Sequence, residues 1–304
     1  MENIGEPDNK NIGKPKKEVY NPNKKEVDRF DKLVKKNKDS GKHWYYGLEG
    51  KWWWGMTEEQ TRQKIESGKV RHKIAITSII RNEEHNGSLK KFLDCCEKLE
   101  HYHKDIVYIF IEGDSSDNTY GALQEWLKLR KDYILKKIDR EKPRFSKDKS
   151  SERTIYFAEL RNVLIDLVIT IPDITEVLMI DANYEWKGDL ISLLRNADAD
   201  IVAPLVIMNR DDNGKHIFYD VWAFRKDGKQ FSHYYPYVRG FESGKPIKID
   251  SAGGGYLIRR RVLDAKVRYN GNKDCEHVGF CRKARKKGFT IKINPKIYIR
   301  KIGE

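Results

Sequence analysis

The strongest constraint on the fold is the alternation of apolar runs and amphipathic segments between residues 72 and 207. Runs rich in Val, Ile and Leu, typical of buried strands, occur at residues 72–80, 105–114, 133–138, 175–183 and 200–207. Segments with apolar residues at helical spacing occur among them at residues 88–102, 118–130 and 153–169. Strands that alternate with helices form a mostly parallel central sheet with helices on both faces, so we expect an α/β fold.

Composition argues against a membrane-spanning or disulfide-stapled protein. The chain contains no run near the ~18 apolar residues that a membrane-spanning helix requires. Residues 1–20 are polar throughout, so we expect no signal peptide. The cysteines lack the CxxC spacing of zinc and redox sites, and they stand at Cys95, Cys96, Cys275 and Cys281. We therefore expect a reduced, cytoplasmic location.

Residues 1–70 differ in composition from the rest and are expected to form an N-terminal arm beside a domain at residues 71–304. Residues 1–40 are rich in Lys, Asn, Asp and Pro, as flexible segments are. Residues 43–56 hold six aromatic residues, which either stack on sugar rings or bases or pack over the domain. Residues 57–69 are typical of a short capped helix.

Basic charge is concentrated near the end of the chain. The chain has 60 Lys and Arg against 46 Asp and Glu, a formal charge of +14. Residues 259–301 hold 15 of the basic residues against three acidic ones, a local charge of +12. Such a stretch attracts nucleotide diphosphates, nucleic acid or an acidic surface. The alternative is a solvated helix face that serves solubility.

Three of the expected strands end in residues that are able to do chemistry. These residues are Arg81, Asn82 and Glu83 after the first strand, Asp114 and Asp117 after the second, and Asp181 and Asn183 after residues 175–180. Ligands of α/β sheets bind at the carboxyl ends of the strands, where carboxylates suit a ribose or a metal that bridges phosphates. Asp117, followed by Asn118 and Thr119, is also typical of a helix N-cap.

The ordered motifs resemble GT-A glycosyltransferases, which transfer a sugar from a nucleotide sugar. RNEEHN (81–86) and DNTYGALQEWL (117–127) are similar to segments of collagen galactosyltransferases. Mannan-polymerase mannosyltransferases are similar in the segments YFAELRNVLID (156–166), VLMIDANYEW (177–186), DSAGGGYLIRRRVL (250–263) and CEHVGFCRKARKKGF (275–289). The resemblance covers residues 72–301 and implies a GT-A, Rossmann-like fold.

The resemblance also implies roles for individual residues. Donor binding is implied for Arg81, Asn82, Glu83, Asp114, Arg161, Asp181, Asn183, Gly254, Arg300 and Lys301. Acceptor binding is implied for Asp220, Trp222, Arg225, Gly253 and His277. Asp181 and Glu276 are the implied catalytic residues. Glu276 would be the base of an inverting enzyme and would only orient the acceptor in a retaining one, and its alternative role is to stabilise a helix N-terminus.

Two departures from the family concern the metal. The usual DxD is Asp181-Ala182-Asn183 here, and an amide is a poorer ligand for Mn²⁺ or Mg²⁺ than a carboxylate. A metal-binding His is expected near the last strand, where Arg300 and Lys301 stand instead. A fixed cation neutralises a diphosphate by the same electrostatics, so weak or absent metal dependence is our hypothesis. The alternative is that Asp181 and Asn183 still hold the metal, together with His277.

The expected function is glycosyl transfer from a nucleotide sugar, a UDP- or GDP-hexose or pentose, to a hydroxyl acceptor. A glycan, a protein or hydroxylated bases in the DNA of a virus or phage, in the host cytoplasm, are the acceptors considered. The alternative is a non-catalytic GT-A-like module that binds nucleic acid or a protein partner. A nucleotidyltransferase is disfavoured, because no Gly-rich loop with a Lys follows the first strand.

Overall fold

The computed structural model describes a central domain and a short hairpin before it. It describes residues 43–46, 52–56, 73–85, 87–142, 145, 150–210, 216–271 and 274–302. Strands β1 (His43–Tyr46) and β2 (Trp52–Met56) pair antiparallel, and they lie in the aromatic segment. The helix expected at 57–69 and the arm before residue 43 lie outside the described residues. The role of the aromatic segment and the boundary at residue 70 therefore stay predictions.

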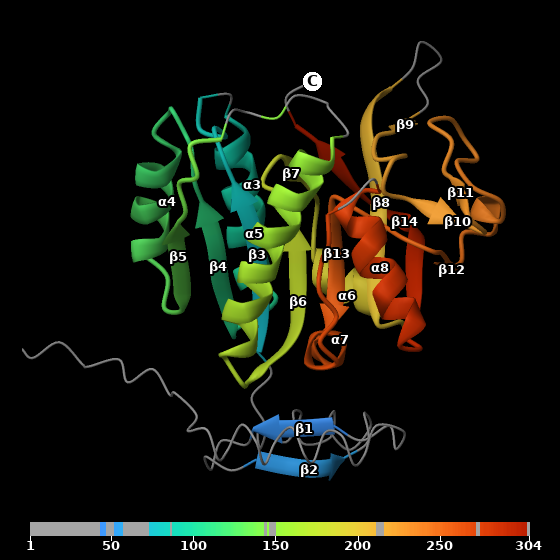
Figure 1. The fold of residues 1–304 in the computed structure, drawn as a ribbon, viewed down its shortest axis with the longest axis horizontal. Helices are drawn as coiled ribbons and strands as arrows, with labels where there is room; N and C mark the ends of the chain where they lie inside the picture. Colours follow the sequence, from blue (N-terminus) through green and yellow to red (C-terminus); the bar gives the residue numbers. More distant parts are fainter. Residues whose placement is uncertain are drawn as a thin grey trace, which may run out of the picture. The chain divides into compact units, whose positions relative to one another are not determined.

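One large sheet forms the centre of the domain (Figure 1). Its main strands are β3 (Lys73–Ile80), β4 (Ile106–Glu112), β5 (Tyr133–Lys137), β6 (Ile174–Ile180), β8 (Ile201–Arg210), β12 (Ile247–Lys248), β13 (Gly255–Arg259) and β14 (Ile291–Lys301). Their spatial order is β12-β14-β8-β13-β6-β3-β4-β5. Strands β5, β4, β3 and β6 are parallel, and β13 runs antiparallel between β6 and β8. The expected mostly parallel sheet is confirmed.

Helices cover both faces of this sheet (Figure 1). They are α3 (Ser88–Glu100), α4 (Thr119–Lys128), α5 (Ser151–Ile169), α6 (Leu190–Arg195), α7 (Arg260–Asp264) and α8 (Glu276–Lys286). Tyr108 of β4 contacts Trp126 of α4, and Phe110 contacts Phe92 of α3. Because alternate strand residues point to opposite faces, Ile109 lies on the other face, on which α5 packs against β3 and β4.

Smaller elements complete the domain. They are β7 (Tyr184–Glu185), β9 (His216–Phe218), β10 (Arg225–Lys226), β11 (Lys229–Gln230) and a 3-10 helix, η1 (Phe241–Ser243). The four cysteines are free and buried, as expected for a chain without a disulfide framework. Within the described residues, no helix combines the length and hydropathy needed to cross a bilayer.

The expected strands and helices between residues 72 and 207 are all found, with ends shifted by a few residues. The antiparallel strand β13 has no counterpart among the predicted elements. It spans five residues and is followed at once by α7, so its sequence is too short to show the repeating pattern of apolar residues by which a strand is recognised. Its position matters, because it ends the parallel run of strands beside β6.

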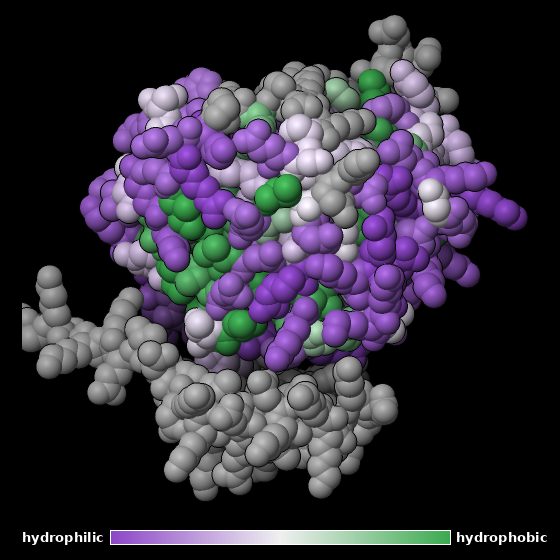
Figure 2. Space-filling view, viewed as in Figure 1, coloured by the Kyte–Doolittle hydropathy of each residue, from purple (hydrophilic) through white to green (hydrophobic). Residues whose placement is uncertain are grey.

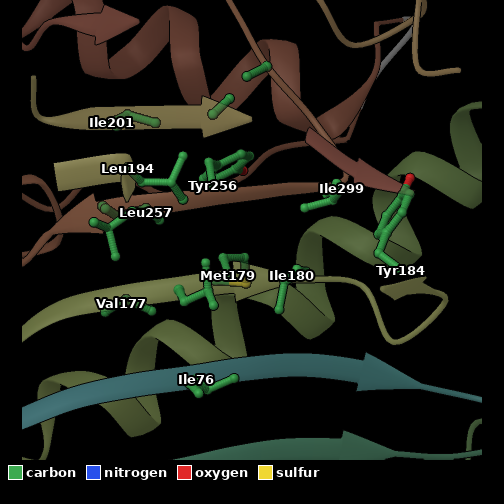
Figure 3. Close-up of a cluster of buried hydrophobic side chains, with 14 of the residues drawn as sticks. Ile76, Val177, Met179, Ile180, Tyr184, Leu194, Ile201, Tyr256, Leu257 and Ile299 are labelled. Carbon is green, nitrogen blue, oxygen red and sulfur yellow. The ribbon is translucent and has the colours of Figure 1, made fainter. Parts of the chain in front are cut away.

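The turn after β6 is held from both sides. The amide of Asp181 donates to the carbonyl of Gly254, 2.9 Å away, just before β13. The amide of Ile302 donates to the carbonyl of Asn183 at 2.8 Å, just after β14. Figure 3 shows Ile180 of β6 and Ile299 of β14 on the side of Tyr184 that faces the strands. The fold therefore brings the ends of β6 and β14 and the start of β13 to one place.

Truncation of Phe92 to Ala is expected to destabilise the domain. The Phe92 side chain is 0% exposed and packs between the rings of Phe110 and Trp186, so the variant leaves a cavity under the sheet. We expect the free energy of unfolding to fall by about 3–5 kcal/mol. Leu129→Ala, at a side chain that is 83% exposed, is the control and should cost less than about 0.5 kcal/mol. Urea unfolding followed by circular dichroism measures both, and equal losses would contradict this packing.

Candidate functional site

The loops after β3 and β4 are joined by side-chain hydrogen bonds. The amide oxygen of Asn82 accepts from the backbone N–H of Ser116 at 2.7 Å, and Thr119 Oγ1 accepts from the N–H of Glu83 at 3.0 Å. Asp117 Oδ1 accepts from the N–H of Thr119 at 3.1 Å, whereas the N-cap residue of α4 is Asn118, whose side chain makes no capping hydrogen bond. The groups expected to hold the nucleotide are therefore fixed as one rigid edge, and Asn82 and Glu83 contribute to its framework.

Asp114 organises the segment after β5. Its Oδ1 accepts from the backbone N–H groups of Arg140 and Glu141, both at 2.8 Å, and its Oδ2 accepts from the Tyr156 hydroxyl at 3.2 Å. Arg81 Nη1 lies 3.8 Å from the same Oδ2. Although partial burial opposes ionisation, these hydrogen bonds and Arg81 hold the pKa of Asp114 below its usual value. Asp114 is thus an anion at neutral pH whose oxygens already have donors within the protein.

A buried arginine joins the turn after β6 to helix α8. Arg161 of α5 is 4% exposed, and its Nη2 donates to Asp181 Oδ1 at 2.8 Å. Its Nε lies 3.6 Å from Oε1 of Glu276, the first residue of α8, which is 3% exposed. Burial opposes the charge on Arg161, yet the two carboxylates raise its pKa well above the usual range. Asp181 and Glu276, the two expected catalytic residues, therefore share one cation.

His277 extends this group into a chain of hydrogen bonds. Its Nδ1 lies 2.9 Å from the Tyr256 hydroxyl, which lies 2.5 Å from the Tyr269 hydroxyl. Its Nε2 lies 3.6 Å from Glu276 Oε1. Burial first, and then the charges of Arg161 and Arg153, hold the pKa of His277 well below its usual value. The ring is therefore neutral at pH 7 and lies beside Glu276.

Asp220 reaches the same group from the loop after β9. The loop is tied to residues near β13, since Ser251 Oγ donates to the carbonyl of Ala223 at 2.6 Å. A Cβ added at Gly253 would lie 2.4 Å from Asp220 Oδ2 and 3.3 Å from His277 Cδ2. Burial raises the pKa of Asp220 to about 7, and the carboxylates of Asp181 and Glu276 act in the same direction. The sequence placed Asp220 near an acceptor, and the structure brings it beside the expected catalytic residues.

The glycines before β13 allow a close approach of backbone and side chains. Gly254 has φ +70°, and a Cβ there would lie 2.8 Å from the Tyr184 hydroxyl. Burial, and then Asp220 and Asp181, raise the pKa of Tyr184 well above its usual value, so its hydroxyl keeps its proton. Gly253 and Gly254 therefore leave room for Asp220 and Tyr184 to reach the edge of the sheet.

Lysine and arginine side chains from two other elements approach this edge. Lys301 ends β14, pairs with Tyr184 in the strand ladder, and its Nζ lies 5.7 Å from the ring centre of Tyr219. Arg153, in the first turn of α5, lies 5.5 Å from the ring centre of Trp222. No carboxylate of the described residues lies within ion-pair distance of either cation.

The other two expected basic residues have partners of their own. Arg300 forms an ion pair with Glu185, and its side chain is 57% exposed. Arg225 lies 3.9 Å from Asp274, and its backbone bridges Ser251. Arg300 is therefore turned to solvent beside β7, whereas Arg225 anchors the loop that carries Asp220 and Trp222.

The two side chains of Asp181-Ala182-Asn183 that could hold the implied metal differ in what already binds them. Asp181 Oδ1 already accepts from Arg161, whose charge repels a divalent cation. The Asn183 amide oxygen is buried and has no hydrogen-bond partner in the described part of the chain, so it is left to accept from an ion or ligand. Among the described residues, no three His, Cys, Asp or Glu side chains are grouped to hold an ion. The turn is thus built around the guanidinium of Arg161.

The basic stretch at residues 259–301 is partly neutralised, because five of its arginines pair with acids from outside the stretch. All of its arginines form ion pairs: Arg259–Glu176, Arg260–Asp264, Arg261–Asp200, Arg268–Asp166, Arg282–Asp274, Arg285–Asp250 and Arg300–Glu185. Figure 2 shows hydrophilic side chains crowded over the region of α7 and α8. The local charge of the sequence therefore overstates the attraction of this surface for a polyanion.

Four residues of this group were not expected in the site from the sequence. Arg153 lies in a polar segment, and Tyr184, Tyr256 and Tyr269 resemble ordinary core aromatics. Only Tyr184 had a local signal, because it directly follows the Asp181-Ala182-Asn183 motif. Tertiary packing brings Tyr256 and Tyr269 to His277, and the spacing of these residues along the sequence does not reveal such contacts.

Comparison with known proteins identifies the fold as GT-A. No known family profile matches the sequence, and no curated protein sequence matches it. GalNAc-T7, solved with UDP, GalNAc and Mn²⁺, is similar in structure with a TM-score of 0.50 and 14% identity, over 76% of this chain and 43% of that one. S. aureus TarS, solved with UDP-GlcNAc, is similar with a TM-score of 0.49 and 13% identity, over 76% of this chain and 59% of that one.

A third similar structure is the mannosyltransferase PcManGT from Pyrobaculum calidifontis with GDP-Man and Mn²⁺. Its TM-score is 0.48 at 14% identity, over 75% of this chain and 56% of that one. The chain thus spans less than two thirds of the length of each of these proteins. The likeness to GalNAc-T7, at 14% identity, establishes the fold alone, and the expected GT-A architecture is confirmed.

The neutral, buried state of His277 predicts that the fold is sensitive to acid. Unfolding frees the ring to bind a proton with its ordinary pKa of about 6.5, so stability is fully present above that pH and falls below it. We expect the Tm of the wild type to drop between pH 7.5 and 5.5, and the drop to be smaller in His277→Asn. His101→Gln, at an exposed residue, should keep the wild-type profile. An unchanged drop in His277→Asn would show that other groups set the acid limit.

Proposed function

We propose that this chain transfers a sugar from a nucleotide-sugar donor to a hydroxyl group of an acceptor. The observation that carries the proposal is the meeting of Asp181, Asp220 and Glu276 with Arg161 at the carboxyl end of β6, on a GT-A sheet. Ligands of open α/β sheets bind at such strand ends. A buried carboxyl with a shifted pKa, as at Asp220, is typical of a catalytic site.

The donor would lie along the ends of β4, β3 and β6, which are neighbours in the sheet. Its nucleoside would face Arg81 and Asp114, and its diphosphate would face the turn at Asp181. The support is that α5 reaches both groups, since Tyr156 contacts Asp114 and Arg161 contacts Asp181. UDP and GDP are the nucleotides we would test first.

The negative charge of the leaving diphosphate would be met by protein cations. Lys301 and Arg153 approach the site and have no carboxylate partner in the described residues, whereas Arg161 is already matched by Asp181 and Glu276. A preorganised cation stabilises charge that develops in a transition state. We therefore propose that Lys301 and Arg153 take the role that a metal has in DxD enzymes.

Donor hydrolysis tests the reaction class and its metal dependence together. Purified protein would be incubated with UDP-, GDP-, CDP- and dTDP-sugars, in Mn²⁺ and separately in EDTA. We expect slow release of nucleotide from one donor at similar rates in both conditions, because the cations belong to the protein. Loss of release in EDTA with full recovery in Mn²⁺ would refute the metal-independent mechanism. Release from no donor would refute the proposed function.

The role of Lys301 is tested by Lys301→Met, with Lys296→Met on the same strand as the control. Lys296 is exposed and lies before the end of β14. We expect Lys301→Met to lower kcat for donor hydrolysis by roughly tenfold to a hundredfold, about 1.4–2.7 kcal/mol of transition-state stabilisation. Lys296→Met should keep the wild-type rate. Equal rates in the two variants would remove Lys301 from the site.

A further inference from the structure

The three carboxylates at the carboxyl end of β6 differ in what already binds them. Asp181 accepts from Arg161 at 2.8 Å. Glu276 is 3% exposed and lies 3.6 Å from both Arg161 Nε and His277 Nε2. Among the described residues, the Asp220 carboxylate accepts only the backbone N–H of Ala223, at 3.3 Å, through Oδ1. Two of the carboxylates are thus compensated by Arg161, and the third is not.

The free oxygen of Asp220 lies where a substrate hydroxyl could reach it. Asp220 is half-buried, whereas Glu276 is enclosed at the start of α8. Asp220 Oδ2 stands against the backbone of Gly253, where even a Cβ would overlap it at 2.4 Å. The loop that carries Asp220 also carries Trp222, whose ring lies under Arg153. Of these two carboxylates, Asp220 is the more exposed, so it is the more accessible to a substrate hydroxyl.

We infer that Asp220 is the general base that takes the proton from the attacking hydroxyl, and that Glu276 is a positioning residue held by Arg161. This inference rests on the proposed function. As the acceptor oxygen forms its bond to the anomeric carbon, its proton passes to Asp220 Oδ2. The bond from the anomeric carbon to the diphosphate breaks, and its electron pair leaves with the nucleoside diphosphate. A single displacement of this kind inverts the configuration at the anomeric carbon.

The surroundings of Asp220 suit a base that works near neutral pH. Burial, together with Asp181 and Glu276, places its pKa at about 7, where proton transfer is most efficient for a group that must be ionised at working pH. Titratable or charged groups face it from every neighbouring element, namely Asp181 after β6, Tyr184 of β7, Arg153 of α5, and Cys275, Glu276 and His277 around the start of α8. Arg153 alone among these favours the ionised form.

The test compares Asp220→Asn with Glu276→Gln, using UDP or GDP as the binding probe and the donor hydrolysed by the wild type as substrate. In the wild type, log kcat for hydrolysis should rise with unit slope up to about pH 7 and then level. In Asp220→Asn, we expect kcat at pH 7.5 to fall roughly a hundredfold or more, with the acid limb lost and the nucleotide Kd unchanged within about twofold. Glu276→Gln should keep the fall of kcat below about pH 7.

A stability measurement shows that Asp220→Asn folds and that the right group was changed. Because the folded pKa of Asp220 lies above its unfolded value, ionisation at high pH costs stability, and the amide removes that cost. The Tm of Asp220→Asn should therefore exceed that of the wild type at pH 8.5, with a smaller difference at pH 5.5. Chiral analysis of the product formed with methanol as acceptor should show inversion.

Each contrary result has its own meaning. If Asp220→Asn keeps the wild-type rate and acid limb, or if Glu276→Gln alone loses the limb, the base is not Asp220. Retention of configuration would also overturn the inference, because a single displacement inverts. If the wild type binds UDP and GDP no better than AMP and releases no nucleotide from any donor, the proposed function fails and the inference fails with it.

Discussion

The architecture of the site depends on the buried guanidinium of Arg161. Helix α5 carries it to the sheet edge, where it meets Asp181 after β6 and Glu276 at the start of α8. Removing one partner of a buried ion pair leaves an uncompensated charge, which is far more costly than losing a surface pair. The three elements are therefore held in one arrangement. His277, Tyr256 and Tyr269 continue that arrangement into the core.

Much of the fold could be predicted from the sequence because its signals are local. Buried parallel strands such as residues 106–112 are continuous apolar runs, and helices such as residues 88–100 bury one face, so each has a clear pattern. β13 and the short strands around residues 216–248 carry no such pattern. Their pairing is set by contacts with segments distant in the sequence, including Gly255 with Ile180.

The site was predictable only in its outline. The strand-end position of Asp181 follows from the pattern, and the grouping of Asp220 and Glu276 with it was expected from the family resemblance. Which carboxylate is compensated by a cation depends on tertiary contacts, as does the ion pairing of the basic stretch. Local charge counts fail here because Arg259 and Arg261 find their acids, Glu176 and Asp200, tens of residues away.

Helix α5 has a consequence for how this chain is able to vary over evolution. It supplies Arg153, Tyr156 and Arg161, which contact three different parts of the site. A helix fixes such residues by a rise of about 1.5 Å and a turn of about 100° per residue. One inserted or deleted residue between Arg153 and Arg161 would rotate one of these side chains by about 100° relative to the other, so both could not face the site. Single substitutions leave these angular positions unchanged. Sequence change within α5 should therefore be confined to substitutions, and insertions or deletions should fall outside the helix.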